Sequence, residues 1–285
     1  MIIINSKNIE IKKINKPYSK FSKEDKDYLI YVYYNYKNLK VPEIREMLGV
    51  SRQTYLKVMK EYGINYRLKN RYTLNENYFQ KINTKEKAYI LGLIYADGFV
   101  GEGNNFALGM KDKQIIEDVA KALEFTGDIR KSDVGGFKNS KGCYRINISN
   151  KKFVSDLKRH GVHSRKSLTL NEFPKIEERL YGDFLRGYFD GDGSISFYVK
   201  NTTKKGKLYS YEVLHMTILA TEPFILKIRE KFDIKGGIRP SKTKELVYLD
   251  IQGKKDLLNL YELMYKNATI FLHRKKKIWD SYYKK

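Results

Sequence analysis

Cysteine is nearly absent from this chain of 285 residues, and this absence excludes two kinds of site. A lone Cys143 cannot form an intramolecular disulfide or a zinc site made of cysteines. The four histidines, at positions 160, 163, 215 and 273, lack the close spacing of metal ligands. No apolar run approaches the roughly 18 residues that cross a membrane, and residues 1–10 are too short for a signal peptide. We therefore expect a soluble cytoplasmic protein with no membrane partner.

Acidic residues are also scarce. The chain carries 33 Asp and Glu against 56 Lys and Arg, which gives a net charge of +23. A charge of this sign and size favours a polyanionic partner, either a nucleic acid or an acidic membrane surface. An AT-rich genome, which enriches Lys, Asn, Ile and Tyr without selection for binding, is the alternative source of the charge. With 41% hydrophobic residues the chain is expected to fold, into one to three domains.

Residues 1–64 are expected to form a small all-α module. Gly49 marks a tight turn between helices 41–48 and 52–62, and Ser51 is placed to cap the second helix. Three apolar residues of helix 52–62 recur at helical spacing and should point inward: Tyr55, Val58 and Met59. The opposite face is polar and basic, with Arg52, Gln53, Lys57 and Lys60.

This module resembles a helix-turn-helix DNA reader, and the resemblance extends over all three of its helices. It implies that helix 52–62 lies in the major groove, with Arg52 and Gln53 nearest to the base edges. A plain three-helix bundle is the alternative. The next segment, 65–85, is basic and has no strong periodicity, so it is interpreted as a linker that follows a phosphate backbone or as a simple tether.

From residue 86 the chain repeats one order of elements, first over 86–170 and again over 171–285. Each copy is predicted as helix, two strands, helix, two strands and helix. Sequence similarity between the copies is low outside two short motifs, so the repeat is inferred from the pattern of elements. The predicted fold class is therefore α+β, with tandem pseudo-twofold αββαββα repeats and antiparallel sheets behind the small helical domain.

The predicted strands alternate between apolar and polar residues. One face of each sheet should therefore pack on helices, and the other should meet solvent or a ligand. The polar face is rich in side chains that suit base edges and phosphates. It comprises Arg145, Asn147, Ser194, Ser196, Tyr198, Lys200, Tyr248 and Gln252. An ordinary solvated sheet has the same pattern, so the alternation alone is weak support for DNA binding.

Each repeat begins with an apolar helix that ends in Asp and Gly, namely ILGLIYADG at 90–98 and LRGYFDGDG at 185–193. Small residues four positions apart allow two helix backbones to approach closely. These residues are Gly92, Ala96, Gly187 and Gly191. We expect them to form the seam between the repeats, and we expect Gly98 and Gly193 to take a left-handed backbone just past the helix ends.

This packing would place Asp97 and Asp192 side by side at two helix C-termini, where a negative charge costs about 0.3–1 kcal/mol. Two neighbouring carboxylates also repel each other, so one of them tends to stay protonated. The arrangement suits a hard divalent cation such as Mg²⁺ or Mn²⁺, with the carbonyls of Ala96 and Gly191 adding oxygens. Two such ions can stabilise the attacking and leaving oxygens of a phosphodiester. The alternative is that each Asp only caps a turn.

Both motifs resemble the signature of the LAGLIDADG homing endonucleases in their two-motif, single-chain form, over about 86–285. The resemblance implies a monomer whose two saddle-shaped sheets lie along the major groove of double-stranded DNA. It also implies that Asp97 and Asp192 bind the metal, that Gly92 and Gly187 lie in the helix seam, and that both strands are cut with short 3′ overhangs. Such a protein would associate with DNA or the nucleoid, and an organellar origin stays open.

A basic residue in each repeat is expected to assist DNA cleavage near the aspartates. Lys166 matches a family position between the repeats, and the second repeat offers Lys275, with Lys276 as the competing choice. Such a lysine can stabilise transition-state charge or polarise the attacking water. The first motif has Tyr95 where the pattern has Asp, whereas the second keeps Asp190, so the two halves should not be equivalent.

Two other functions stay open. A transcription regulator with this fold would bind DNA without cutting it, but such proteins lose the acidic residues that this chain keeps. An RNA maturase would use the same scaffold to help an intron fold, and its partner would be intron RNA. Because the splicing residues of an intein are missing from the chain ends, a free-standing protein is expected.

Overall fold

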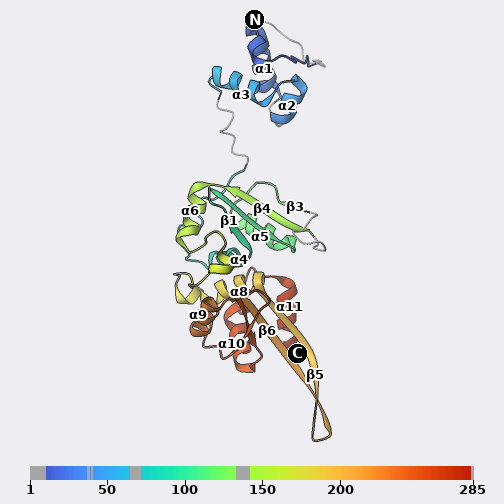
Figure 1. Ribbon diagram of the computed structural model, residues 1–285, viewed down its shortest axis with the longest axis vertical. Helices are drawn as coiled ribbons and strands as arrows, with labels where there is room; N and C mark the ends of the chain where they lie inside the picture. Colours follow the sequence, from blue (N-terminus) through green and yellow to red (C-terminus); the bar gives the residue numbers. More distant parts are fainter. Residues whose placement is uncertain (1–10, 37–38, 40, 65–71, 133–141, 284–285) are drawn as a thin grey trace. The chain divides into compact units, whose positions relative to one another are not determined.

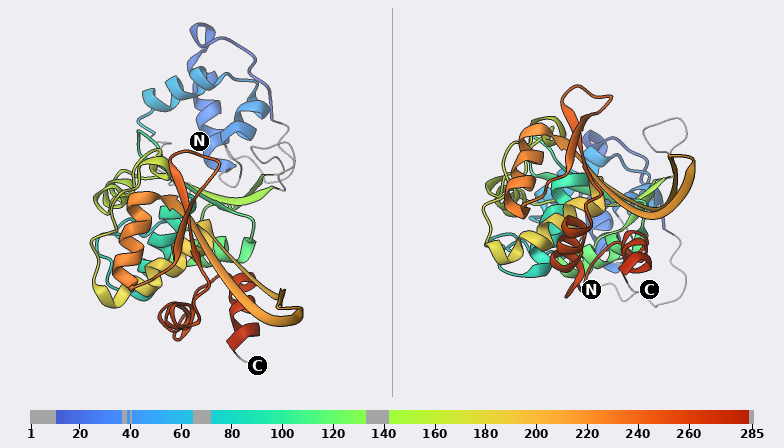
Figure 2. Two further views of the ribbon diagram at one scale, coloured as in Figure 1. Left: turned by 60° about the horizontal axis from the view of Figure 1, so that its bottom comes forward. Right: turned by 90° about the horizontal axis from the view of Figure 1, so that it is seen from below.

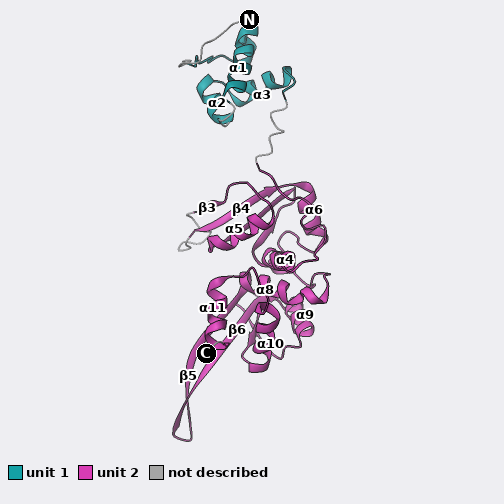
Figure 3. Cartoon of the chain, turned by 180° about the vertical axis from the view of Figure 1, so that it is seen from behind, with its two compact units in different colours: residues 1–71 teal, residues 72–285 magenta. Residues whose placement is uncertain are grey.

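The computed structural model describes residues 11–36, 39, 41–64, 72–132 and 142–283. The chain divides into two compact units, residues 1–71 and 72–285, which are coloured separately in Figure 3. Among the described residues, no helix combines the length and the apolar character that a membrane crossing requires.

The first unit is all-helical, as the sequence predicts. It contains η1 (Tyr18–Lys20), α1 (Lys23–Asn35), α2 (Val41–Leu48) and α3 (Arg52–Glu61). Gly49 turns the chain between α2 and α3 with a φ of +63°, and the hydroxyl of Ser51 caps α3 by accepting a hydrogen bond from the N–H of Thr54. The residues predicted to point inward are buried, namely Tyr55, Val58 and Met59.

The segment that precedes the first repeat packs against it. Tyr78 and Phe79 are buried in the core of the second unit. The boundary predicted at residue 85 therefore falls inside a packed segment, because the apolar residues of the supposed linker find a place in the core. Residues 65–71 of that linker lie outside the described part of the chain.

The first repeat has the predicted order of elements. They are α4 (Lys85–Asp97), β1 (Gly98–Val100), β2 (Asn105–Met110), α5 (Lys113–Ala122), β3 (Arg130–Ser132), β4 (Cys143–Ser149) and α6 (Lys151–Arg159). The strands form an antiparallel sheet in the order β1-β2-β4-β3, and α5 and α6 pack against it (Figure 1). Two short helices lead to the second repeat, α7 (Lys166–Thr169) and η3 (Glu178–Leu180).

The second repeat follows the same order. Its elements are α8 (Tyr181–Asp192), β5 (Gly193–Lys204), β6 (Lys207–Thr221), α9 (Glu222–Phe232), β7 (Gly237–Pro240), β8 (Leu246–Ile251) and α10 (Lys254–Tyr265). The sheet order is β5-β6-β8-β7, again antiparallel, which confirms the predicted α+β fold of tandem repeats. A further helix that the sequence pattern did not predict, α11 (His273–Tyr283), packs against β5 and buries Trp279.

The two sheets differ most in the length of their first hairpin. β1 and β2 have 3 and 6 residues, whereas β5 and β6 have 12 and 15. Figure 2 shows β5 and β6 continuing as a curved ribbon beyond the helices that cover the rest of the sheet. In both sheets one face is buried under helices; the other, here called the open face, carries the polar residues of the alternating strands.

Candidate active site

The site is built where α4 and α8 cross at close range. A Cβ placed on Gly92 would lie 2.1 Å from a main-chain oxygen of α8, and one on Gly187 would lie 1.9 Å from a main-chain oxygen of α4. No side chain fits at either position, because backbone atoms of a packed helix cannot yield that space. Ala96 and Gly191 continue the contact, since a Cβ on Gly191 would lie 2.3 Å from the Cβ of Ala96.

Both helices end at the motif aspartates, Asp97 in α4 and Asp192 in α8. The expected left-handed glycines are wrong: Gly98 has a φ of −72° and Gly193 one of −92°, and each begins a strand. Glycine is required there by space instead, because a Cβ would come within 2.6 Å of a carbonyl oxygen at Gly98 and within 2.1 Å of a ring carbon at Gly193. In each repeat the backbone thus passes directly from helix to strand, and the motif aspartate lies at the junction.

The two carboxylates lie near enough to affect each other's ionisation. The pKa of Asp192 is raised to about 7, mainly by desolvation and to a smaller extent by the negative charge of Asp97. Desolvation also raises the pKa of Asp97, although part of its side chain still meets solvent. Within the described residues, neither carboxylate accepts a hydrogen bond or forms an ion pair at contact distance. The fold therefore holds two acids together without satisfying either of them.

Lys166 and Lys275, one from each repeat, are buried beside this pair. Their exposed fractions are 4% and 3%. The ammonium of Lys166 donates to the carbonyl of Ala96 at 3.0 Å, whereas that of Lys275 donates to three carbonyls around the end of α8, at 2.5, 2.8 and 2.6 Å. Burial lowers the pKa of both lysines, that of Lys275 to about 8, while the charges of Asp97 and Asp192 act in the opposite direction.

The competing lysine of the second repeat points elsewhere. Lys276 donates to Asp280 at 2.6 Å, one turn further along α11. Of the two candidates, Lys275 is therefore the one that the structure brings to the aspartates.

The oxygen donors at this site suit a hard cation that takes few protein ligands. The described residues contain no group of three or more His, Cys, Asp or Glu side chains that could hold a metal ion. At this site they offer the carboxylates of Asp97 and Asp192 together with main-chain carbonyls. The carbonyl of Ala96 already accepts from Lys166. Mg²⁺ characteristically takes one or two carboxylates and completes its octahedron with water and substrate phosphates. The residues present fit such an ion.

The sixth residue of each motif is buried and anchors a neighbouring segment, a role the sequence did not indicate. The carboxylate of Asp190 accepts hydrogen bonds from the N–H of Leu272 at 2.7 Å and from the hydroxyls of Tyr89 at 2.8 Å and Tyr265 at 3.5 Å. The hydroxyl of Tyr95 donates to the carbonyl of His160 at 2.5 Å. No local pattern could have identified these partners, because they are distant in sequence from the motifs.

The polar strand residues predicted to bind DNA lie on the open faces. In β4, Arg145 and Asn147 are exposed while the isoleucines that flank Asn147 are buried. In β5, four exposed residues share the face opposite the buried Ile195: Ser194, Ser196, Tyr198 and Lys200. Tyr248 of β8 is half-buried, and Gln252, just past that strand, is exposed. Because β1 and β5 start directly after the aspartates, each open face begins at a carboxylate.

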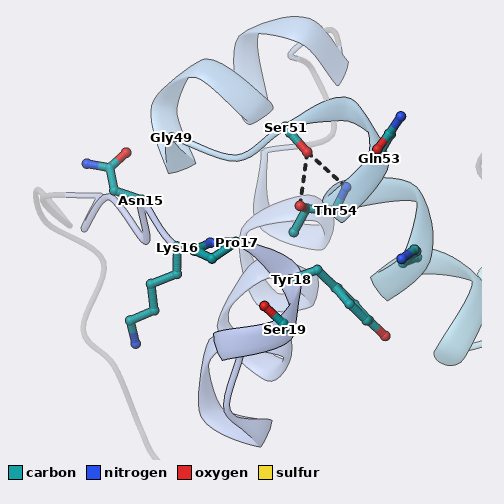
Figure 4. A pocket seen from close by; sticks show the side chains of 10 residues that line it. Asn15, Lys16, Pro17, Tyr18, Ser19, Gly49, Ser51, Gln53 and Thr54 are labelled. Carbon is teal, nitrogen blue, oxygen red and sulfur yellow. Dashed lines mark hydrogen bonds between the residues drawn. The ribbon is translucent and has the colours of Figure 1, made fainter.

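The first unit presents its predicted DNA-binding residues along one helix. Arg52, Gln53, Lys57 and Lys60 are all exposed on α3. Gln53 and Lys57 also line a pocket of about 670 Å³ against η1, shown in Figure 4, where the cap of α3 by Ser51 is visible. This face of α3 is therefore exposed within the unit, although Lys57 lies over the ring of Tyr18 at 5.0 Å.

A family model of the LAGLIDADG-like domain matches residues 84–160 and 180–265, together more than half of the chain. No curated protein sequence matches the chain. Among solved structures, the chain resembles the I-LtrWI LAGLIDADG homing endonuclease bound to target DNA, with a TM-score of 0.50, 16% identity, and coverage of 72% of this chain and 89% of that one. It also resembles the I-SmaMI LAGLIDADG homing endonuclease bound to cleaved DNA, with a TM-score of 0.48, 14% identity and coverage of 70% and 88%.

Proposed function

Because this chain belongs to the LAGLIDADG family, we propose that it is a site-specific endonuclease that cuts both strands of DNA as a monomer. Cleavage requires a divalent metal ion, leaves short 3′ overhangs, and takes place on each strand near one of the motif aspartates. The single observation that carries the proposal is the pair Asp97 and Asp192, which two helices hold together without a hydrogen bond or contact ion pair from any described residue.

Asp97 and Asp192 are the residues that would hold Mg²⁺ or Mn²⁺, with main-chain oxygens of Ala96 and Gly191 close by. When bound, such ions activate water and neutralise charge on the phosphate. Lys166 and Lys275 keep a positive charge buried beside the site, where it stabilises negative charge that builds on the phosphate.

The remaining parts of the chain would hold the duplex. The open faces carry Arg, Asn, Ser, Tyr and Lys side chains that suit base edges and phosphates. The first unit adds a second, tethered contact through the exposed face of α3, which raises affinity through effective concentration. With a net charge of +23, binding should weaken steeply with salt, because each neutralised phosphate contributes about 0.9 to the slope of log K against log[salt].

The test is selection of cleaved duplexes from a randomised DNA library. The full chain is incubated with the library and Mg²⁺, and the ends are sequenced to give the target and both cut positions. We expect one target family with double-strand breaks and 3′ overhangs, and no cleavage by Asp97→Asn or Asp192→Asn under the same conditions. Asp118→Asn is the matched control and should cut normally, because Asp118 is a partly exposed acid on α5 whose hydrogen-bond donor is Gln114 of the same helix.

Two results would overturn this function. Enrichment of bound duplexes without any cleavage in Mg²⁺ or Mn²⁺ would indicate a DNA-binding regulator. Absence of DNA cleavage together with restored splicing of an intron RNA would indicate a maturase.

A further inference from the structure

The open face of the second sheet carries a cluster of polar side chains that has no part in the site around Asp97 and Asp192 and is not required for packing of the core. It consists of Arg239 on β7, Tyr248 and Asp250 on β8, and His215 on β6. Arg239 is the register partner of Tyr248, and Asp250 is that of Thr217. Since Leu249, between Tyr248 and Asp250, is fully buried under the helices, the cluster lies on the face that we propose meets DNA.

The cluster holds one guanidinium in a fixed orientation. The Nε of Arg239 donates to one carboxylate oxygen of Asp250 at 2.5 Å, and the guanidinium carbon lies 4.0 Å from the centre of the Tyr248 ring. The other carboxylate oxygen of Asp250 lies 2.9 Å from the Nε2 of His215. Asp250 is thus held from both sides, and it in turn holds the guanidinium against the ring.

The outer edge of this guanidinium is left free. Within the described part of the chain, Arg239 has no hydrogen-bond partner other than Asp250, and its side chain is 52% exposed. The two terminal nitrogens therefore present a planar pair of donors to the open face. A planar pair of donors matches the O6 and N7 acceptors that guanine shows in the major groove, and this is the commonest specific contact between an arginine and a base pair.

A phosphate is a poorer match for the same group. Asp250 carries a negative charge next to Arg239, which offsets the attraction that a bare arginine would have for the backbone. A base edge is neutral and is recognised by direction rather than by charge, so fixing the plane of the guanidinium favours the base. Loss of rotamer freedom is also smaller for a side chain that is already held in place.

We propose that Arg239 reads a guanine in the half-site bound by the second repeat, and that Asp250 and Tyr248 are the positioning residues that hold it. This inference rests on the proposed DNA-binding function. It assigns one base pair of the target to one side chain, and it makes the second half-site the one that requires a G·C pair at that position.

The experiment selects bound duplexes from a randomised library with the full chain in EDTA, so that cleavage plays no part. The wild-type pool should require G·C at one position of one half-site. Arg239→Ala should lose the preference at that position by about 5- to 150-fold and keep the preferences elsewhere. Arg239→Lys should not restore it, because an ammonium is a point charge, and Asp250→Asn should weaken it.

Arg130→Ala is the matched control. Arg130 is an exposed arginine on β3, the strand of the first sheet that corresponds to β7, and it has no acidic or aromatic partner among the described residues. The Arg130→Ala variant should therefore keep the guanine preference of the wild-type chain. If Arg239→Ala lowers affinity for all duplexes equally, or leaves the guanine preference unchanged, the inference is wrong while the proposed function stands. If the wild-type chain enriches no duplex at all, the proposed function fails as well.

Discussion

The two repeats build the same junction of helix, aspartate and strand, but they secure their lysines in different ways. Lys166 donates to one carbonyl, that of Ala96, whereas Lys275 donates to three. The sixth motif residue differs as well: Tyr95 donates a hydrogen bond to a carbonyl, and Asp190 accepts hydrogen bonds from an N–H and two hydroxyls.

This difference shows that one structural task has two chemical solutions. In each repeat the sixth residue is tied to the segment that leads to that repeat's lysine, because His160 precedes Lys166 and Leu272 precedes Lys275. A phenol that donates and a carboxylate that accepts can therefore serve the same purpose, provided the partner group changes accordingly. The second half is the more constrained of the two, so we expect the two strands of DNA to be cut at different rates.

The largest expected effect is on the rate of DNA cleavage, and it comes from replacing the motif aspartate that both repeats share. Asp97→Asn or Asp192→Asn should lower the rate of cleavage by at least about 10²- to 10³-fold, because a neutral amide cannot supply the charge that holds the metal. DNA binding in EDTA should be nearly unchanged. Cleavage assays and filter binding on the selected target measure both quantities, and a parallel loss of binding would mean that the aspartate is structural.

The same two variants should also melt at a higher temperature in EDTA at pH 8. The pKa of Asp192 is about 7 in the folded chain, against 3.8 for an ordinary aspartate, which we take for the unfolded chain. Folding therefore disfavours ionisation of Asp192, and the free energy of unfolding falls as the pH rises from 3.8 to 7. Asn cannot ionise and therefore escapes this loss. A melting temperature that falls in both variants would contradict this account.

The second largest effect tests whether the seam is equally tight on both sides. Gly92→Ala and Gly187→Ala each place a Cβ about 2 Å from a main-chain oxygen, at 2.1 and 1.9 Å. Each should lower the free energy of unfolding by about 3 kcal/mol or more, since packed backbones cannot move apart without opening the core. Gly237→Ala, which meets nothing within 4 Å, is the matched control. Chemical denaturation measures all three, and a mild effect of either seam variant would show that the helices can separate.

Much of this architecture could be predicted from the sequence, because it follows from local periodicity. Helical spacing predicted α4 and α8, and alternation predicted β4 and the first half of β5. The inward orientation predicted for Val199 was wrong, because the hairpin of β5 and β6 leaves the core there and neither of its faces is buried. Val199 and Leu208 are therefore exposed. The helix α11 was missed because its apolar positions are separated by a run of lysines.

The candidate site was predictable only in part. The aspartates, the seam glycines and the lysines carry recognisable motifs. The partners of Asp190 and Arg239 carry none, because their contacts join residues that are far apart in the sequence and depend on strand register. The left-handed backbone expected at Gly98 and Gly193 was wrong because a strand begins there directly, a junction that no local signal distinguishes from an ordinary helix end.

A third effect separates the two halves at the sixth motif position. Asp190→Ala leaves three buried donors unpaired, the N–H of Leu272 and the hydroxyls of Tyr89 and Tyr265, each costing about 1–3 kcal/mol. Tyr95→Phe loses one hydrogen bond worth about 0.5–1.5 kcal/mol. Asp190→Ala should also slow mainly one DNA strand, the same strand that Lys275→Met slows. Strand-specific nicking rates on an end-labelled duplex measure this, and equal slowing of both strands would show that Asp190 acts only on stability.

The smallest effect is the pH dependence of Mg²⁺ binding, and it follows from the two neighbouring carboxylates of Asp97 and Asp192. Because the pKa of Asp192 is raised to about 7, binding of Mg²⁺ must displace a proton below that pH. The apparent Kd for Mg²⁺ should therefore fall by up to about tenfold per pH unit between pH 5.5 and 7 and level off above it. Titration of cleavage activity with Mg²⁺ at fixed ionic strength gives the Kd at each pH.

Two variants separate the cause of this pH dependence. Asp97→Asn removes the neighbouring negative charge, so the melting temperature of that variant should vary less with pH between 6 and 8 than that of the wild type. Asp118→Asn should reproduce the wild-type profile. If the Kd for Mg²⁺ is constant from pH 5.5 to 7, the two carboxylates are already ionised in the free protein and the desolvation that we attribute to the helix junction is too weak to hold a proton there.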